Sequence, residues 1–274
     1  MLRIIIITDS RGSLLADCLS GRGLAEDYSP PALEELGKLC LLTVKVYKGA
    51  TVERLENKLP GLLREKQYHL IVLLAGICNL TTVTKERQLK LLHYISEPER
   101  IDTIKQTFTR LDHKYKDRLH ISRIIPACLS TYFKHHNKDK TTPAYLETQQ
   151  VALLDDIEEI NSFITSINSR RGQERLDLDK KLVVQSRKTS KTKTGERRKR
   201  TSRQSVKKEL LPDGVHPSLE LAKKWVDRLL AVLLKWAEKK TEEIQASSSQ
   251  ESESDNERRA WRFKGGRGKA NHRR

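Results

Sequence analysis

Four consecutive isoleucines near the start of the chain constrain its fold more than any other feature. Residues 2–8 read LRIIIIT, and the polar group Thr8-Asp9-Ser10-Arg11-Gly12 follows at once. A β-branched run without alternation is typical of a strand buried on both faces, as in a parallel sheet covered by helices. Since apolar residues recur at helical spacing over 11–25, the chain opens with a strand, a short polar turn and a helix.

The same alternation of strand and helix continues along the chain. The expected strands are 2–8, 40–47, 69–76, 118–127 and 181–185, and the expected helices are 11–25, 51–65, 97–116, 144–169 and 218–240. Strands that alternate with helices form right-handed crossovers and a sheet covered on both faces. The sequence therefore predicts an α/β fold: a three-layer α/β/α sandwich around a mostly parallel, five-stranded sheet.

Charge is distributed unevenly along the 274 residues. The net charge is +17, and residues 187–209 alone hold 11 Lys and Arg against 2 acidic residues. The stretch 186–209 has a single apolar residue, Val206, and the residues after 240 form an acidic, serine-rich block followed by a basic one. Such segments bury too little apolar surface to offset the entropy of ordering. We expect one domain over 1–240, with a disordered insertion at 186–209 and a disordered tail at 241–274.

What the sequence lacks disfavours several classes of protein. No apolar run reaches the roughly 18 residues that span a bilayer, and residues 2–8 are too short for a secretory signal. The four cysteines are scattered, without a CxxC pair or a histidine at ligand spacing, which argues against a disulfide framework and a zinc site. We expect an intracellular protein, cytoplasmic or nuclear, without a transmembrane segment and without a metal or cofactor.

Ser10 lies between the first expected strand and the first expected helix. Backbone N–H groups in the first turn of a helix are unpaired, and the helix dipole favours negative charge there. A serine at this place is able to attack a carbonyl group beside donors for the resulting oxyanion. The alternative is that Asp9 or Ser10 only caps the helix, which is the commoner role of such residues.

The segment LPDGVHPS, 211–218, places Asp213 three residues before His216 in a turn ahead of the last expected helix. One tight turn then holds a carboxylate against one imidazole nitrogen while the other nitrogen serves as a general base. Pro-Asp-Gly is also a common turn and His-Pro-Ser a common helix lead-in, so a purely structural role is the alternative.

Two further segments fall at the same edge of the sheet, because the carboxyl ends of parallel strands meet at one rim. Gly49 follows the second expected strand, where its backbone N–H can approach a ligand. Gly76 and Asn79 follow the third, where an amide side chain can donate to an oxyanion. Each taken singly is more simply explained by turn formation, so their order along the chain is what suggests a site.

That order resembles the block order of the SGNH (GDSL-type) hydrolases over about residues 3–238, most specifically in TDSRG and DGVHPS. In detail it is similar to the divergent SGNH domains of non-LTR retrotransposons and related animal proteins. The resemblance implies the three-layer sandwich and a Ser-His-Asp triad in which Ser10 is the nucleophile, His216 the base and Asp213 its orienting partner. The implied oxyanion donors are the Ser10 N–H, Gly49 and Asn79.

Two positions depart from the family pattern. Thr8 stands where the family has the glycine of Gly-Asp-Ser. The third block, normally Gly-x-Asn-Asp, reads Gly76-Ile77-Cys78-Asn79, so that an alignment without a gap places the oxyanion asparagine on Cys78. A thiol is a poor donor, and the loss of one good donor typically costs about 10²–10³ in rate.

The resulting expectation is a serine esterase or acylhydrolase acting on a small or lipid-like ester that the sequence does not identify. The alternative is a weakly catalytic or non-catalytic SGNH-fold module that binds RNA or DNA through its basic segments. Lysine and arginine would contact phosphates, and aromatic residues in the tail would stack on bases. The residues expected in that role are Arg197, Arg198, Lys199, Arg200, Trp261 and Phe263.

Overall fold

The protein folds around a four-stranded parallel sheet. The computed structural model describes residues 1–22, 27–86, 88–188 and 201–264. Its central sheet has the strand order β2-β1-β3-β6. The strands are β1 (Leu2–Thr8), β2 (Cys40–Val46), β3 (Leu70–Leu74) and β6 (Leu119–Ile121), and neighbours are parallel throughout. The predicted parallel α/β architecture is therefore confirmed.

Strand β1 explains why four isoleucines occur in a row. Ile4 and Ile6 pack into one apolar cluster and Ile5 and Ile7 into a second, and none of the four is more than 1% exposed. Successive side chains of a strand point to opposite faces. A strand that lies inside the sheet and is covered on both faces therefore requires an apolar residue at every position.

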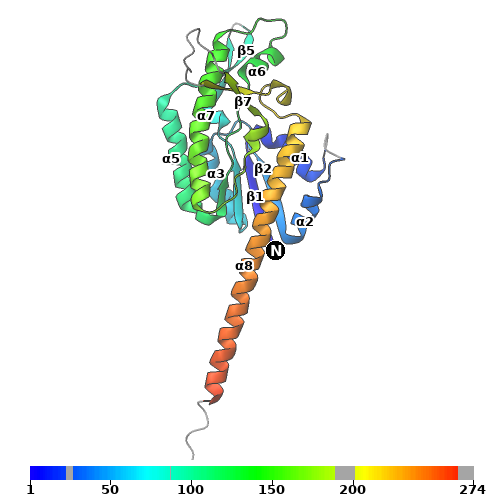
Figure 1. The fold of residues 1–274 in the computed structure, drawn as a ribbon, viewed down its shortest axis with the longest axis vertical. Helices are drawn as coiled ribbons and strands as arrows, with labels where there is room; N and C mark the ends of the chain where they lie inside the picture. Colours follow the sequence, from blue (N-terminus) through cyan, green and yellow to red (C-terminus); the bar gives the residue numbers. More distant parts are fainter. Residues whose placement is uncertain (23–26, 87, 189–200, 265–274) are drawn as a thin grey trace, which may run out of the picture.

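Helices cover both faces of the sheet and complete the three layers (Figure 1). One face carries α1 (Ser13–Ser20), α2 (Pro31–Leu39) and α8 (Leu219–Lys264), and the other carries α3 (Val52–Glu65), α5 (Pro98–Tyr115) and α7 (Tyr145–Arg170). Shorter helices are α4 (Ile77–Leu80), α6 (Leu129–His136), η1 (Ser10–Gly12), η3 (Lys116–Arg118), η4 (Leu178–Lys181) and η5 (Lys208–Leu210). None of the helices in the described ranges is long and apolar enough to cross a membrane.

Two antiparallel hairpins stand apart from the sheet. One pairs β4 (Thr81–Glu86) with β5 (Leu89–Tyr94), and the other pairs β7 (Val183–Lys188) with β8 (Thr201–Val206). The segment 181–185, expected as a fifth strand of the main sheet, instead contributes to β7, so the prediction of five strands is wrong. The expected insertion at 186–209 is likewise partly a hairpin, and its residues 189–200 lie outside the described residues.

Side-chain amides of α7 take the place that a fifth strand would occupy. The amide of Asn168 accepts from the N–H of Ile121 at 3.4 Å and donates to its carbonyl at 2.6 Å. Asn161 pairs in the same way with Ile124, at 2.6 and 3.0 Å. Backbone groups at a buried sheet edge need partners. Because two amides of a packed helix supply them, the edge at β6 is closed without another strand.

Replacing Asn161 by leucine is expected to destabilise the protein by about 1–3 kcal/mol for each backbone group left unpaired, since the Ile124 N–H and carbonyl are buried. Urea denaturation followed by circular dichroism measures the change. The control is Ser162→Ala, at the exposed neighbouring position of α7, which should shift the midpoint little. Equal midpoints for the two variants would contradict the role assigned to Asn161.

The carboxyl-terminal segment differs from the disordered tail expected at 241–274. Helix α8 runs without a break to Lys264, and its second half extends beyond the domain (Figure 1). No proline or glycine interrupts 219–264, and Gly265-Gly266 follows. A helix nucleated by a packed first half propagates at little cost through residues of good helix propensity. Residues 265–274 lie outside the described residues.

Candidate active site

The order in which strands are added to the sheet reverses between β1 and β3, and the carboxyl ends of these two strands lie side by side at that point. From β1 the chain passes to β2 on one side, and β3 then pairs with the other side of β1. The connection after β1 lies on one face of the sheet and the connection after β3 on the other, which opens a crevice between them in folds of this kind. The turns that follow β1 and β3 meet there.

Asp9, and not Ser10, caps the helix that follows β1. The Asp9 carboxylate accepts from the Arg11 N–H at 3.0 Å, which makes Asp9 the N-cap of η1. Ser10 is the first residue of η1 and is partly exposed, and its hydroxyl makes no hydrogen bond within the described residues. The capping alternative for Ser10 is therefore excluded, and its hydroxyl is left without a structural task.

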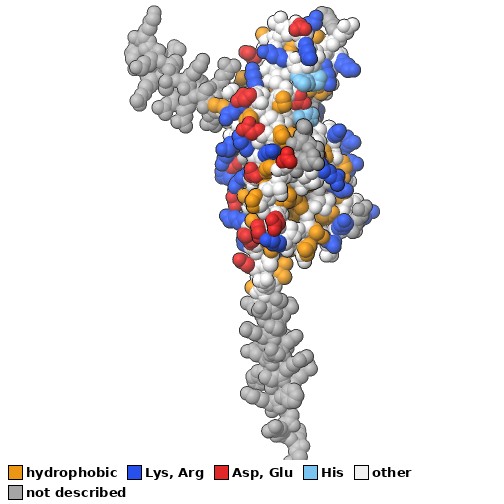
Figure 2. Space-filling model, turned by 90° about the vertical axis from the view of Figure 1, so that its right-hand side faces the viewer, with side chains coloured by type: hydrophobic (Ala, Val, Ile, Leu, Met, Phe, Trp, Pro, Cys, Tyr) orange, Lys and Arg blue, Asp and Glu red, His pale blue; other side chains and the backbone are white. Residues whose placement is uncertain are grey.

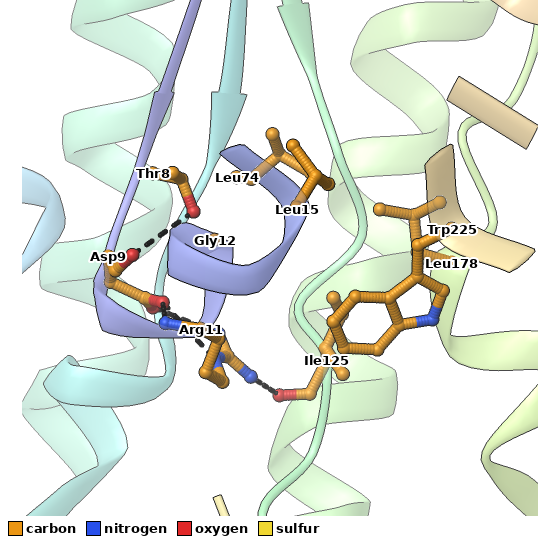
Figure 3. Close-up of a pocket in the computed structure, with 9 residues that line it drawn as sticks. All are labelled: Thr8, Asp9, Arg11, Gly12, Leu15, Leu74, Ile125, Leu178 and Trp225. Atoms are coloured by element: carbon orange, nitrogen blue, oxygen red, sulfur yellow. Dashed lines mark hydrogen bonds and ion pairs between the residues drawn. The ribbon is translucent and has the colours of Figure 1, made fainter. Parts of the chain in front are cut away.

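The residues on either side of Ser10 in the sequence, Asp9 and Arg11, form a buried ion pair (Figure 3). The Arg11 guanidinium donates to both carboxylate oxygens of Asp9, at 3.2 and 3.0 Å, and also to the carbonyl of Ile125. The side chains of Arg11 and Asp9 are only 4% and 1% exposed. Arg11 thereby ties the turn after β1 to the chain that leaves β6.

A small cavity lies on the α8 side of this ion pair (Figure 3). It is lined by Thr8, Asp9, Arg11, Gly12, Leu15, Leu74, Ile125, Leu178 and Trp225. Neither Ser10 nor His216 lines this cavity, so it is not the substrate site expected from the sequence. A Cβ at Gly12 would overlap the Thr8 side chain, which explains why glycine is required once threonine occupies the first position of TDSRG.

Asp213 and His216 form a hydrogen-bonded pair in one turn. Asp213 accepts from the N–H groups of Val215 and His216, at 2.9 and 2.7 Å, and lies 2.5 Å from His216 Nδ1. Because a carboxylate only accepts, the ring proton is on Nδ1 and Nε2 is the nitrogen left for a base. The His216 side chain is 47% exposed.

The charge state of Asp213 is set by its environment. Burial alone raises the pKa of a carboxyl, but the hydrogen bonds from the His216 ring and from the His216 and Val215 N–H groups outweigh it and hold the pKa of Asp213 well below its ordinary value. Asp213 is therefore ionised wherever an esterase is ordinarily assayed, as an orienting partner of a histidine base must be.

Gly214 docks this turn onto α6. Its backbone has a φ of +82°, and its carbonyl accepts from the Cys128 N–H at 2.7 Å. A Cβ here would overlap the Tyr132 N and lie 2.5 Å from the Cys128 carbonyl oxygen. Both the left-handed conformation and the close approach exclude a side chain, so the glycine of DGVH fixes the turn against the first turn of α6.

The two parts of the expected triad are held by the two ends of one short segment. Arg11, next to Ser10, bonds the carbonyl of Ile125, and Gly214, between Asp213 and His216, bonds the N–H of Cys128. Both turns are thus attached to the same short segment of chain. No hydrogen bond joins Ser10 to His216 in the described part of the chain.

Asn79 does not lie where a free oxyanion donor is expected. Its side chain is 2% exposed, its Oδ1 accepts from the Val52 N–H at 2.9 Å, and its Nδ2 donates to both carboxylate oxygens of Glu53 at 3.0 and 2.8 Å. Asn79 therefore anchors the first turn of α3, a correction to the expectation that its amide serves a substrate. Nothing in the sequence marked Glu53 as its partner.

Cys78 precedes Asn79 in α4 and is partly buried. Burial, reinforced by the Asp9 charge, raises the pKa of its thiol to about 11, whereas the Arg11 charge lowers it. Gly76 before it has a φ of +129°, and a Cβ there would lie 2.5 Å from Ile124 Cδ1. The alignment without a gap, in which Cys78 takes the asparagine position, stays a prediction.

The remaining predicted residues are placed as follows. Gly49 has a φ of +64° in an exposed turn after β2, with nothing within 4 Å of a Cβ built on it. The Tyr47 N–H donates to the Thr8 carbonyl at 2.8 Å, which joins this turn to the start of TDSRG. Trp261 and Phe263 belong to the far part of α8. The expected phosphate-contacting group Arg197, Arg198, Lys199 and Arg200 lies outside the described residues.

Comparisons with known proteins point to one fold. No family model matches the sequence, and no curated protein matches it either. Among solved structures, a GDSL-like lipase from Bacteroides thetaiotaomicron is 12% identical with a TM-score of 0.50, and covers 86% of this chain and 88% of its own. A putative acylhydrolase from Bacteroides fragilis is 10% identical with a TM-score of 0.51, and covers 87% of each chain.

A lipase/acylhydrolase from Enterococcus faecalis is 13% identical with a TM-score of 0.50, and covers 86% of this chain and 96% of its own. Identities this low establish the fold alone. The chain therefore has the SGNH (GDSL-type) hydrolase fold, as the resemblance implied. The likeness to retrotransposon proteins stays a prediction.

Proposed function

We propose that the protein is a serine esterase of SGNH type, with Ser10 as nucleophile, His216 as general base and Asp213 as its orienting partner. The observation that carries the proposal is the pairing of a hydroxyl without structural partners and a hydrogen-bonded Asp-His pair across the short segment from Ile125 to Cys128. The SGNH hydrolase fold supports it, because the three residues occupy the corresponding places in the block order.

The geometry suits acyl transfer in two steps. His216 Nε2 takes the proton of the Ser10 hydroxyl while its oxygen attacks the ester carbonyl, and the tetrahedral intermediate expels the alcohol with that proton. Water then attacks the acyl-enzyme with the same histidine as base. Asp213 keeps the Nδ1 proton in place and stabilises the imidazolium that forms at each step. Free active sites often hold the serine and histidine apart until substrate binds.

The oxyanion donors in this proposal are the backbone N–H groups of Ser10 and Gly49. The Asn79 amide is committed to Glu53, and Cys78, in its place, offers only a weak S–H donor. We infer a working but slow enzyme, since the lack of one good oxyanion donor costs about 10²–10³ in kcat.

Ser10→Ala is expected to abolish labelling by a fluorophosphonate probe and hydrolysis of 4-nitrophenyl butyrate, because the nucleophile is gone. Labelling is read by gel fluorescence and peptide mass spectrometry on the full chain. Ser13→Ala, three residues along and also partly buried, is the matched control and should be labelled as wild type is. A wild type that folds but is neither labelled nor active would sink the esterase proposal.

Cys78→Asn is expected to raise kcat for the same ester by about tenfold or more, because an amide donor enters the position aimed at the oxyanion. Cys78→Ala, which removes the thiol without adding a donor, is the control and should not raise kcat. Steady-state kinetics distinguishes the two. If both variants lower kcat equally, Cys78 has another role and the placement of the oxyanion hole fails.

A nucleic-acid-binding module on the same fold stays the alternative. Its support is the sequence itself, with 11 basic residues in 187–209. Catalysis at the carboxyl edge of the sheet and polyanion binding by this segment are compatible. The fluorophosphonate experiment therefore tests catalysis and leaves nucleic-acid binding to a separate measurement.

A further inference from the structure

Two lysines without ion-pair partners in the described part of the chain lie near a histidine and a tyrosine, of which the tyrosine packs against the Asp213–His216 turn. They lie on the β4–β5 hairpin and on α6, and the name hairpin–α6 cluster is used here for Lys85, Lys90, Tyr132 and His136. Figure 2 shows Lys, Arg and His side chains at the end of the molecule that carries β5 and α6 in Figure 1. Its two segments are far apart along the chain: Lys90 and Asn137, which are hydrogen-bonded to each other, are separated by 47 residues, so local sequence does not indicate the cluster.

The two lysines of the cluster are placed so that their like charges repel each other. Lys85 and Lys90 are directly opposite each other in the antiparallel register of the hairpin. Like charges at such positions destabilise a sheet. Neither lysine has an ion-pair partner within the described residues, whereas Lys38, Lys105 and Lys224 on the helices are each paired with a glutamate. An anion between the two lysines would relieve the repulsion.

Hydrogen bonds and ring contacts hold the residues of the cluster in a defined arrangement. The Asn137 side chain accepts from the Lys90 N–H at 2.8 Å and donates to its carbonyl at 2.7 Å, which fastens β5 to the end of α6. The Lys90 ammonium lies 5.6 Å from the centre of the Tyr132 ring, and that ring stacks on His136 at 4.2 Å. His136 Nδ1 donates to the Tyr132 carbonyl at 3.0 Å. Nε2 is then free to donate to a phosphate oxygen when the ring is in its imidazolium form.

Tyr132 connects the cluster to the catalytic turn. Its ring contacts Lys90 and His136, while its backbone N is so close to Gly214 that no Cβ fits between them. Gly214 lies between Asp213 and His216. Tyr132 therefore takes part both in the cluster, through its ring, and in the packing of the Asp213–His216 turn, through its backbone.

We propose that the ester attacked by Ser10 carries a phosphate group, which Lys85, Lys90 and His136 bind beside the acyl-transfer centre. The proposal rests on the proposed function and names its substrate class. A phosphate monoester matches this set, since it brings up to two negative charges and three acceptor oxygens to two ammonium groups and an imidazole. An uncharged ester would leave the lysine pair without a counter-charge.

Binding tests the phosphate site without any turnover. Glycerol 3-phosphate is titrated into the full-length wild type and into the double variant Lys85→Gln/Lys90→Gln at low salt, by calorimetry. We expect wild type to bind it at least tenfold more tightly than the double variant, and glycerol to bind neither. Lys114→Gln is the matched control, because Lys114 also lies over a tyrosine ring, 5.5 Å from the centre of Tyr115, at the end of α5. Equal affinity in wild type and the double variant, or an equal loss in Lys114→Gln, overturns the site.

Turnover then tests the substrate class. Monobutyrin and its 3-phosphate differ only by the phosphate, and kcat/KM is measured for both. We expect wild type and Lys114→Gln to favour the phosphorylated ester at least tenfold, and the ratio to collapse towards one in the double variant. An unchanged ratio, or a double variant that loses only binding of single-stranded RNA, overturns the proposal. If wild type does not react with fluorophosphonate, the esterase proposal fails, and the assignment of its substrate fails with it. Binding of glycerol 3-phosphate would then support a phosphate site without esterase activity.

Discussion

Replacing Arg11 by methionine is expected to lower the free energy of unfolding by about 3–5 kcal/mol, because it leaves the Asp9 carboxylate buried without its partner. The Ile125 carbonyl loses its donor in the same variant. Urea denaturation monitored by circular dichroism measures the loss. Activity should fall with it, since Arg11 holds the turn that presents Ser10.

Two further variants separate the buried ion pair from a general effect of arginine. Arg110→Met removes an exposed pair with Glu56 and should cost less than about 1 kcal/mol. Asp9→Leu/Arg11→Met removes both buried charges and should be more stable than Arg11→Met alone, because no uncompensated charge is left. Equal losses in Arg11→Met and Arg110→Met would show that burial of the Asp9–Arg11 pair is not what stabilises the turn.

Asp213→Asn is expected to lower kcat by about 10⁴ without unfolding the protein, since the amide can no longer stabilise the imidazolium or dictate which ring nitrogen is protonated. Hydrolysis of 4-nitrophenyl butyrate measures the change. The control is Asp102→Asn, an exposed aspartate on α5, which should leave kcat within a factor of two of wild type. A loss below tenfold in Asp213→Asn would mean that His216 acts without this partner.

The same variant has a consequence for stability at low pH. The folded pKa of Asp213 lies below its ordinary value of 3.8. Its ionised form therefore contributes stability that is complete above the unfolded pKa and is lost as the pH falls through the folded value. Thermal denaturation between pH 5 and pH 2 should show a smaller acid-induced fall in Tm for Asp213→Asn than for wild type.

The spacing of apolar residues was sufficient to determine the core of the fold. Ile4–Ile7 can be buried only if both faces of β1 are covered, and the alternation of such runs with amphipathic segments predicts the parallel sheet and its flanking helices. The candidate positions in TDSRG and DGVHPS were readable for the same reason, because they follow or precede those elements at fixed distances along the chain.

Contacts between residues far apart in the chain decided features of the fold that the local spacing of apolar residues does not indicate. The number of strands depends on whether another strand or the amides of Asn161 and Asn168 reach the edge at β6, and residues 181–185 have the strand pattern in either case. Residues 241–264 contain little that local patterning marks for burial, and helix α8 continues into them from its packed first half by propagation.

In the candidate site, too, local sequence determined some features and tertiary contacts decided others. Local sequence determined that Asp213 and His216 share a turn and that a serine follows β1. Only the tertiary structure decided that Asp9 is the cap, that Arg11 is buried against it, and that the Asn79 amide bonds Glu53. The physical reason is that a polar side chain's role depends on which partner lies within hydrogen-bonding distance, and those partners come from other strands and helices.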